Sequence, residues 1–313
     1  MMPRCRDDAL SEVVGFVLLL GLIVVLFSMY VTYAVPAEGR EIEIQHMKEV
    51  NTRFTAYKES MDALWMNAPE NPTGTSGTYG VTMSTSFDLG TIGSTTQGGF
   101  SLFPILSPIG SSGTMIIDGS DGTLTVTRND LETLLEAPLG SIKYNSANNY
   151  WVQQDYYYQM GGVFLSQESG VINKISPVFT VYNLSDIAAI SITPVKISGD
   201  QFITGSGSVR LDSRLQIKNQ YFDTAQGAQS IKIEVDVGSL KEAKAWDRVF
   251  RDTATMNNVP ASWYETGYSG DESSGNAYID VDGPTTGTDV DVKIDVIRAD
   301  YIVSLQNVAT EIT

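Results

Sequence analysis

Apolar and polar positions follow three different patterns along this chain, and each pattern predicts a different element. From Val13 to Ala34 almost every position is apolar and no residue is charged. A helix needs about 20 apolar residues to cross the hydrocarbon core of a bilayer, so this run is long enough to span it. Pro36 follows the run, and we expect it to end or kink the helix, because proline lacks a backbone donor and clashes with the preceding turn.

A second helical pattern, with a narrower apolar stripe, covers residues 37–67. The stripe recurs in steps of three and four residues, and Trp65 lies beside its last member. It consists of Met47, Val50, Phe54, Tyr57, Met61 and Leu64. This spacing predicts an amphipathic helix that packs against another surface. Packing against the chain's own β domain is favoured over packing between subunits. The proline and glycine residues of "APENPTGTSGTYG", from Ala68, are expected to end the helix.

After residue 80 the apolar positions alternate with a period of two, which is typical of strands that expose one face. Three segments show it: "SIKIEVDV" from Ser230, "TDVDVKIDV" from Thr288, with Val290 as its first apolar member, and "YWVQQDYYYQMGGVFL" from Tyr150. The alternation that starts at Val290 changes phase at Val296–Ile297, which predicts a bulge or a bend.

One helix is expected among the strands, in "GSLKEAKAWDRVF", where Ser239 and Glu242 have the spacing of a capping box. The fold class predicted is α+β: a long N-terminal transmembrane helix, then an antiparallel β-sandwich-like head with one short helix. The corresponding segments are a leader, a membrane or filament-core helix, an amphipathic stalk helix and the head, at residues 1–9, 10–36, 37–67 and 68–313.

The composition of the chain excludes some classes of partner and of stabilising bond. The formal net charge is -17, from 37 acidic and 20 basic residues, and such a surface would repel the phosphates of a nucleic acid. We therefore expect no nucleic-acid partner. Cys5 is the only cysteine, so no intrachain disulfide can form and packing must hold the head together. Lipidation of Cys5 is a weaker alternative to an incidental residue, because the small residues expected before a lipidated cysteine are missing.

The residues before the apolar run are arranged differently from those of an ordinary secretory signal. An ordinary cleaved signal has an apolar region of about 7–15 residues, followed by a small-residue cleavage site. Here the run is longer, and the small residue Ala9 precedes it within "RDDALSEVVG". This arrangement resembles the class III signal of archaeal type IV pilins. In that family a prepilin peptidase cuts on the cytoplasmic side, and the apolar segment stays on the mature protein. The resemblance implies cleavage between Ala9 and Leu10.

The position of Glu12 leaves a second cleavage site open. Bacterial type IV pilins carry a glutamate at the fifth mature position, whereas Glu12 would be third after cleavage at Leu10. A cut between Asp7 and Asp8 would make it fifth, but would leave an aspartate before the cut. Further along, "GSIKYNSANNYWVQQDYYYQMGGVFLSQESG" from Gly140 is similar to the β domain of large pilin-like surface proteins of methanogenic archaea, which share a similar start.

The resemblance implies a structural role. Its partners would be the prepilin peptidase, the membrane and other pilin-like subunits in a helical assembly, and its work would be surface assembly and adhesion. The basic residues on the two sides of the span are nearly balanced. We place the N-terminus in the cytoplasm before processing because it is short, and the long acidic head outside the cell. The alternative is a single-pass anchor whose β head binds a ligand or a cell-wall component without forming filaments.

Catalytic chemistry has little support. His46 is the only histidine and lies in the stalk, so neither a Ser-His-Asp nor a Cys-His constellation can form in the head. We expect no enzyme, no cofactor and no metal site. A carboxylate pair that hydrolyses glycosides is the least favoured class. "DGSDG" from Asp118 and "DVDG" from Asp280 could offer oxygen ligands to calcium, but turns are favoured there.

Two surface features remain. Tyr150, Trp151 and Tyr157 could form a platform for stacking a sugar, although aromatic residues in strands more often form cross-strand packing pairs. Asn183, in the sequence Asn-Leu-Ser, is a candidate N-glycosylation site, which fits a surface protein.

Overall fold

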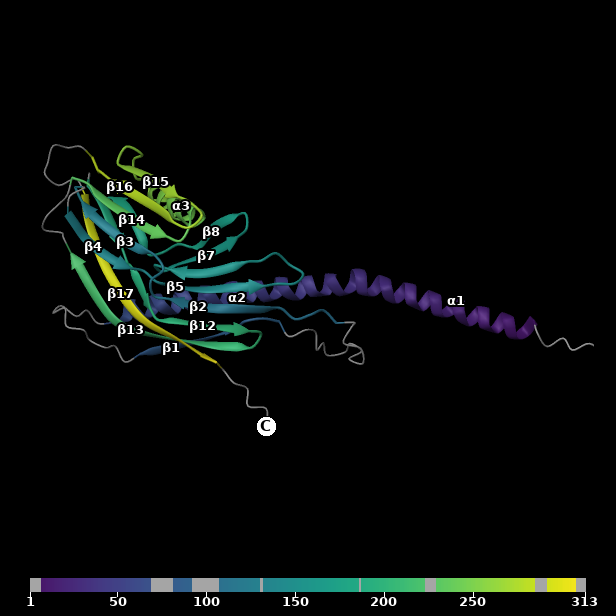
Figure 1. Ribbon diagram of the computed structural model, residues 1–313. Helices are drawn as coiled ribbons and strands as arrows, with labels where there is room; N and C mark the ends of the chain where they lie inside the picture. Colours follow the sequence, from purple (N-terminus) through teal and green to yellow (C-terminus); the bar gives the residue numbers. More distant parts are fainter. Residues whose placement is uncertain are drawn as a thin grey trace, which may run out of the picture.

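A computed structural model describes residues 7–68, 81–91, 107–129, 132–185, 187–222, 229–284 and 292–307. The chain begins with a long helix whose first half projects away from a β-rich head and whose second half enters it (Figure 1). The helical segments are α1 (Asp7–Met29), the π-helical turn η1 (Tyr30–Ala34), α2 (Val35–Asn67) and α3 (Leu240–Met256).

The helix does not end at Pro36, in contrast to one of the two outcomes expected there. Pro36 lies in the first turn of α2, directly after η1, and the helical run continues to Asn67. In η1 the hydrogen bonds shift by one residue, so that the amide of Val35 donates to the carbonyl of Tyr30. The wider turn accommodates the proline ring and its missing donor, which would otherwise break the ladder of bonds.

The described strands form three sheets. The first sheet, in spatial order, contains β1 (Thr82–Asp88), β13 (Ser208–Phe222), β17 (Val292–Asn307), β10 (Ala188–Ile192) and β9 (Phe179–Asn183), with β11 (Val195–Ser198) also paired to β17. The second contains β12 (Asp200–Gly205), β2 (Ser112–Asp118), β5 (Ser141–Ala147), β6 (Asp155–Gln159), β7 (Gly162–Gln167) and β8 (Gly170–Ile175). The third contains β15 (Tyr264–Gly270), β16 (Gly275–Val281), β14 (Ile231–Val237), β3 (Thr123–Arg128) and β4 (Glu132–Pro138).

The predicted α+β class is confirmed, and most neighbouring strands are antiparallel. The pairs β10–β17 and β11–β17 depart from that pattern because they run parallel. Hydrophobic alternation along a strand shows which face is buried, but it is the same for either direction of its neighbour. The parallel direction of these two pairs could therefore not be predicted from the sequence pattern.

The head has two hydrophobic cores. The α2 core lies between α2 and strands of the first and second sheets. The α3 core lies between α3, the third sheet and the strands β9 and β10. The N-cap half of the capping box predicted for α3 is confirmed at Ser239, whose side chain accepts from the amide of Glu242 at 3.4 Å, whereas the carboxylate of Glu242 accepts from the amide of Gly238. The apolar stripe of α3 is buried in this second core, including Ala243, Trp246, Val249 and Phe250.

Strand β17 crosses from one core to the other. Val292, Ile294 and Val296 lie in the α3 core, whereas Ala299, Tyr301 and Val303 lie in the α2 core. The predicted phase change at Val296–Ile297 is confirmed, and Val290 lies outside the described residues. The bulge that accompanies it lies on the neighbouring strand β13, where the register shifts between Leu215 and Ile217.

The segment from Tyr150 is only partly a strand, which corrects the prediction. Residues 148–154 form a loop, β6 begins at Asp155, and a turn at Met160–Gly161 precedes β7. Both faces of β6 are buried, because Tyr157 points into the α3 core and its neighbours Tyr156 and Tyr158 into the α2 core. Alternation of polarity is absent where both faces of a strand are covered.

The stripe on α2 packs against the chain's own head, as favoured. Met47, Val50, Phe54, Tyr57 and Met61 are all buried, and Phe54 lies against Phe87 and Tyr156 with ring centroids 5.2 and 6.0 Å away. Trp65 is more fully buried than Leu64, which is partly exposed. The second half of the long helix is thus the central element of the α2 core.

Replacing Phe54 with alanine tests this packing. Phe54→Ala removes a fully buried ring from the α2 core, so we expect unfolding of the head to cost about 3–5 kcal/mol less. Chemical denaturation in detergent micelles, followed by circular dichroism, measures the change. The control is Glu59→Ala on the exposed side of the same helix, with an expected change within about 0.5 kcal/mol. Similar midpoints for the two variants would contradict the assignment of α2 to the core.

Candidate functional site

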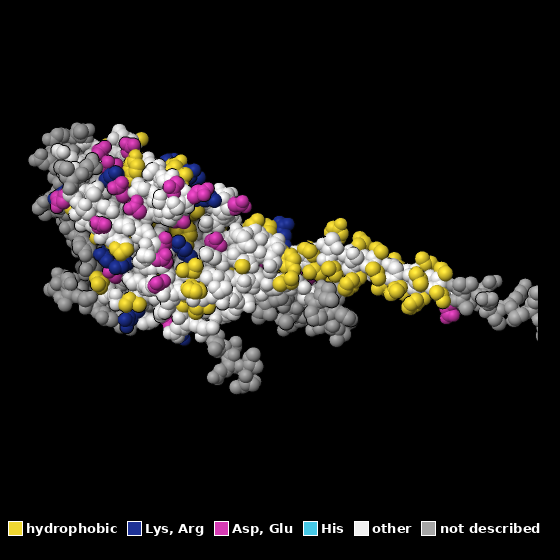
Figure 2. Space-filling model, viewed as in Figure 1, with side chains coloured by type: hydrophobic (Ala, Val, Ile, Leu, Met, Phe, Trp, Pro, Cys, Tyr) yellow, Lys and Arg dark blue, Asp and Glu magenta, His cyan; other side chains and the backbone are white. Residues whose placement is uncertain are grey.

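From Glu12 to Tyr30 every residue is exposed, on all sides of the helix. Figure 2 shows this part of the helix as a continuous rod of apolar side chains that leaves the more polar surface of the head. Its most apolar stretch has a mean hydropathy of 2.7 and no buried residue. By length and composition this helix can cross a membrane. An exposed apolar surface of this size needs a partner, either lipid or protein.

The predicted cleavage site lies at the start of this helix. Ala9 and Leu10 fall within the first turns of α1, and Glu12 follows on the same turn. Cys5 lies outside the described residues. The structure places the predicted cleavage position directly before the apolar rod, so a cut there would leave the rod attached to the head.

Next to the apolar rod formed by α1 and η1, residues 148–154 between β5 and β6 pack against α2. We call these residues the collar loop. Glu43 of α2 is only 1% exposed. Its carboxylate accepts hydrogen bonds from the backbone amides of Asn149, Tyr150 and Trp151, at 2.6, 2.8 and 2.6 Å. Three donors satisfy a carboxylate whose burial would otherwise be costly. We call these three hydrogen bonds to Glu43 the clasp.

Two aromatic residues of the collar loop lie against the helix on the side nearest the rod. The ring of Tyr150 covers Gly39 so closely that a Cβ atom there would lie 2.4 Å from it. The guanidinium of Arg40 lies 4.4 Å from the ring centroid of Trp151. The hydroxyl of Tyr150 accepts from the amide of Ile109 at 3.1 Å, which ties the irregular segment before β2 to the same place.

One turn further along α2, His46 connects the helix to the second sheet. Its Nε2 lies 3.0 Å from the hydroxyl of Tyr144, which donates to the carbonyl of Leu89 at 2.8 Å. Because the hydroxyl of Tyr144 uses its own proton in the bond to Leu89, Nε2 of His46 must carry a proton and donate it to that hydroxyl. Burial lowers the pKa of His46, although the carboxylates of Glu49, Asp88 and Glu43 act in the opposite direction.

The far end of α2 is held by further polar contacts inside the core. Tyr57 shares a hydrogen bond of 2.7 Å with Ser213, and the hydroxyl of Tyr301 donates to the carbonyl of Met61 at 2.7 Å. Burial raises the pKa of both tyrosines well above the usual range, so both stay protonated. These contacts fix the rotation and the axial position of the helix in the head.

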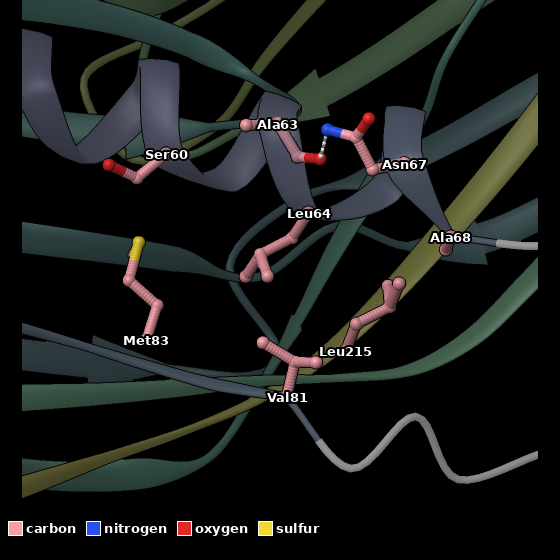
Figure 3. A pocket seen from close by; sticks show the side chains of 8 residues that line it. All are labelled: Ser60, Ala63, Leu64, Asn67, Ala68, Val81, Met83 and Leu215. Atoms are coloured by element: carbon pink, nitrogen blue, oxygen red, sulfur yellow. Dashed lines mark hydrogen bonds between the residues drawn. The ribbon is translucent and has the colours of Figure 1, made fainter.

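A pocket of about 490 Å³ lies beside the end of α2. It is lined by Ser60, Ala63, Leu64, Asn67 and Ala68 of the helix region, by Met83 of β1 and Leu215 of β13, and by Val81 directly before β1 (Figure 3). The amide of Asn67 already donates to the carbonyl of Ala63 at 2.7 Å, as the dashed line in Figure 3 marks. None of the described residues that line this pocket has a titratable side chain, so they offer no acid or base to a substrate.

A second polar cluster joins the second and third sheets. Lys143 pairs with Asp121 at 2.8 Å, and the side-chain amide of Gln159 donates to the carbonyl of Asp121 and accepts from the indole of Trp246. Burial raises the pKa of the nearby Glu242, with Lys143 lowering it and Asp121 raising it. Its carboxylate also accepts from the amide of Gly238 at 3.2 Å. These carboxylates are engaged in structural bonds, which favours a structural junction over a hydrolytic pair.

The aromatic platform considered as a minority hypothesis for sugar stacking does not form. Tyr157 is buried and stacks on its cross-strand partner Phe164 at 5.0 Å, whereas Tyr150 and Trp151 lie on the collar loop against α2. The packing-pair alternative is therefore the correct one for Tyr157. It is the turn of the backbone before Asp155 that separates the three residues.

The remaining predicted residues are exposed or partly buried. Asn183 is the exposed last residue of β9, so the candidate glycosylation site lies on the outside of the head. Asp118 closes a turn after β2, where its carboxylate accepts from the amide of Ser120 at 2.9 Å. Asp280 lies in β16. Among the described residues, no group of three or more histidine, cysteine, aspartate or glutamate side chains is placed to hold a metal ion.

Comparison with family models, with curated proteins and with solved structures found no match for this chain. The site is therefore assigned from its own geometry.

The clasp was missed by the sequence analysis, although a signal was present. Glu43 lies four residues before Met47 and so continues the apolar stripe of α2. An acidic residue at a position that the stripe buries must have several donors close by. The pattern alone cannot identify those donors, because they are backbone amides from a loop about a hundred residues away.

Removing the charge of Glu43 should release the collar loop. In Glu43→Gln, an amide group would face three backbone donors, and we expect a loss of about 3 kcal/mol in stability. Hydrogen exchange should speed up at the amides of Asn149, Tyr150 and Trp151. The matched control is Glu41→Gln, at an exposed position two residues earlier in the same helix, which should leave those amides protected. Unchanged exchange in Glu43→Gln would refute the clasp.

The low pKa of His46 predicts a pH dependence. A base whose pKa is lower in the folded state takes up its proton more readily when unfolded, so its contribution is present above about pH 6.5 and is lost as the pH falls below that value. Denaturation midpoints of wild type and His46→Gln, compared between about pH 5 and 7.5, isolate this effect because both share the other titrating groups. Parallel curves would show that His46 does not contribute.

Proposed function

We propose that this protein is a structural subunit of an archaeal type IV pilus-like surface filament, processed by a prepilin peptidase. The observation that carries the proposal is the division of one continuous helix into two halves. The first half is apolar and exposed on all sides, and the second half is the central element of the head's core. Such a helix can present the head at a fixed position from a membrane or from a bundle of neighbouring helices.

The order of events follows from the leader and the helix. A membrane peptidase acting between Ala9 and Leu10 removes the polar start and leaves the apolar rod on the head. The rod holds the subunit in the membrane until it packs against the rods of other subunits. Helix packing of this kind relies on close van der Waals contact, because lipid offers the same apolar environment as a neighbouring helix.

The head supplies the outer surface of such an assembly. Its acidic exterior suits contact with an aqueous environment, and the two cores hold it together without a disulfide. Its work is surface assembly and adhesion. The single-pass anchor without filaments uses the same helix, and the mature N-terminus separates the two functions.

N-terminal sequencing of the native protein, from membranes and from sheared surface fibres, is the test. We expect a chain that begins at Leu10 in both fractions, whereas a start at Asp8 would select the second cleavage position. Ala9→Trp should block processing, because a bulky residue replaces the small one before the cut. Cys5→Ser, in the same leader but away from the cut, should be processed normally.

Two results would contradict the proposal. A chain that keeps Met1 or Met2 and never leaves the membrane fraction would favour the anchored monomer. A soluble product that has lost residues 10–34 would exclude both the filament and the anchor.

A further inference from the structure

Burial along the helix changes abruptly where the rod meets the head. Tyr33 is 72% exposed, whereas Val35, two residues later, is 7% exposed. No bare segment of helix separates the apolar rod from the head. The part of the head that lies nearest the rod includes the collar loop, which extends along α2 toward α1 (Figure 1).

The helix fixes the height of this loop above a membrane. At a rise of about 1.5 Å per residue, the run from Val13 to Ala34 extends for about 33 Å, which matches the about 30 Å of a hydrocarbon core. Gly39 and Arg40, which contact the collar loop, lie about 8 to 9 Å beyond Ala34. The headgroup layer on each side of a bilayer is about 5–7 Å thick. The collar loop therefore lies at the outer edge of that layer.

The residues at this height have the chemistry of a membrane interface. Ile109 and Val152 are 72% and 53% exposed although the rest of the head shields most of its large apolar side chains. They flank Tyr150 and Trp151, and aromatic residues of these two kinds are enriched at the boundary between lipid and water. Arg40, stacked on Trp151, brings a positive charge to the level of the lipid phosphates.

We propose that Ile109, Tyr150, Trp151 and Val152 form a lipid-contacting tip that seats the head on the headgroup layer of the bilayer while α1 spans it. The clasp on Glu43 prevents the tip from lifting away from the helix, because lifting would break three hydrogen bonds to a buried carboxylate. The tip orients the head before any assembly. The proposal rests on the membrane span and is independent of filament formation.

Site-directed fluorescence on the full chain tests the contact. In a Cys5→Ser background, a single cysteine is introduced by Val152→Cys or by Ile109→Cys. Each variant is labelled with nitrobenzoxadiazole, and the protein is reconstituted in phosphatidylcholine vesicles. Two control positions are Leu22→Cys in the middle of the rod and Met256→Cys, a 79% exposed residue of α3, which packs in the other core. Quenching by aqueous iodide and by lipids that carry a nitroxide near the headgroup reports the location of each label.

For the two tip labels we expect a blue-shifted emission, quenching by the nitroxide lipid, and iodide quenching several-fold weaker than at Met256. Tip labels that behave like Met256 while the Leu22 label is shielded from iodide would overturn the tip and leave the anchor intact. A Leu22 label that is open to iodide would overturn the tip together with the membrane span on which the proposed function depends.

Discussion

The apolar stripe of α2 is buried between two sheets of the head, and the arrangement of the rest of the molecule depends on this burial. Because α1, η1 and α2 form one unbroken helix, fixing α2 inside the core also fixes the direction in which the apolar rod leaves the head. Tyr57, Met61 and their partners on the first sheet set the rotation of the helix. A helix that carried only a surface stripe could pivot, whereas one that fills a core cannot move without opening a cavity.

The clasp at Glu43 extends this control to the last turns before the rod. The buried carboxylate of Glu43 stabilises the fold only while all three backbone amides donate to it, so the collar loop and the helix are held together as one unit. Gly39 permits the close approach of Tyr150, and Arg40 covers Trp151, so that neighbouring positions of one helical turn are all used by the same loop. The same contacts bring exposed apolar side chains to the place where the rod begins.

The two cores of the head are joined by strands that serve both. β17 gives Val296 to one core and Tyr301 to the other, and β6 gives Tyr157 and Tyr158 to opposite sides. The polar cluster of Asp121, Lys143 and Gln159 lies at the same junction. A change in either core therefore affects the strands that shape the other, which links the position of α2 to the integrity of the whole head.

The sequence by itself determined the features that depend on local order: the length of the apolar run, the stripe on α2, the N-cap of α3 and the phase change in β17. Each follows from the spacing of apolar residues or from a hydrogen bond within one turn. Only the tertiary structure decided the parallel pairing of β10 and β11 with β17, the loop before β6, and the burial of Tyr157. It also decided the partners of Glu43, which showed in the sequence only as an acidic residue in an apolar stripe. Their common cause is contact between segments far apart in the chain, because a residue's own neighbours set its local conformation but carry no information about which distant backbone donor will reach it.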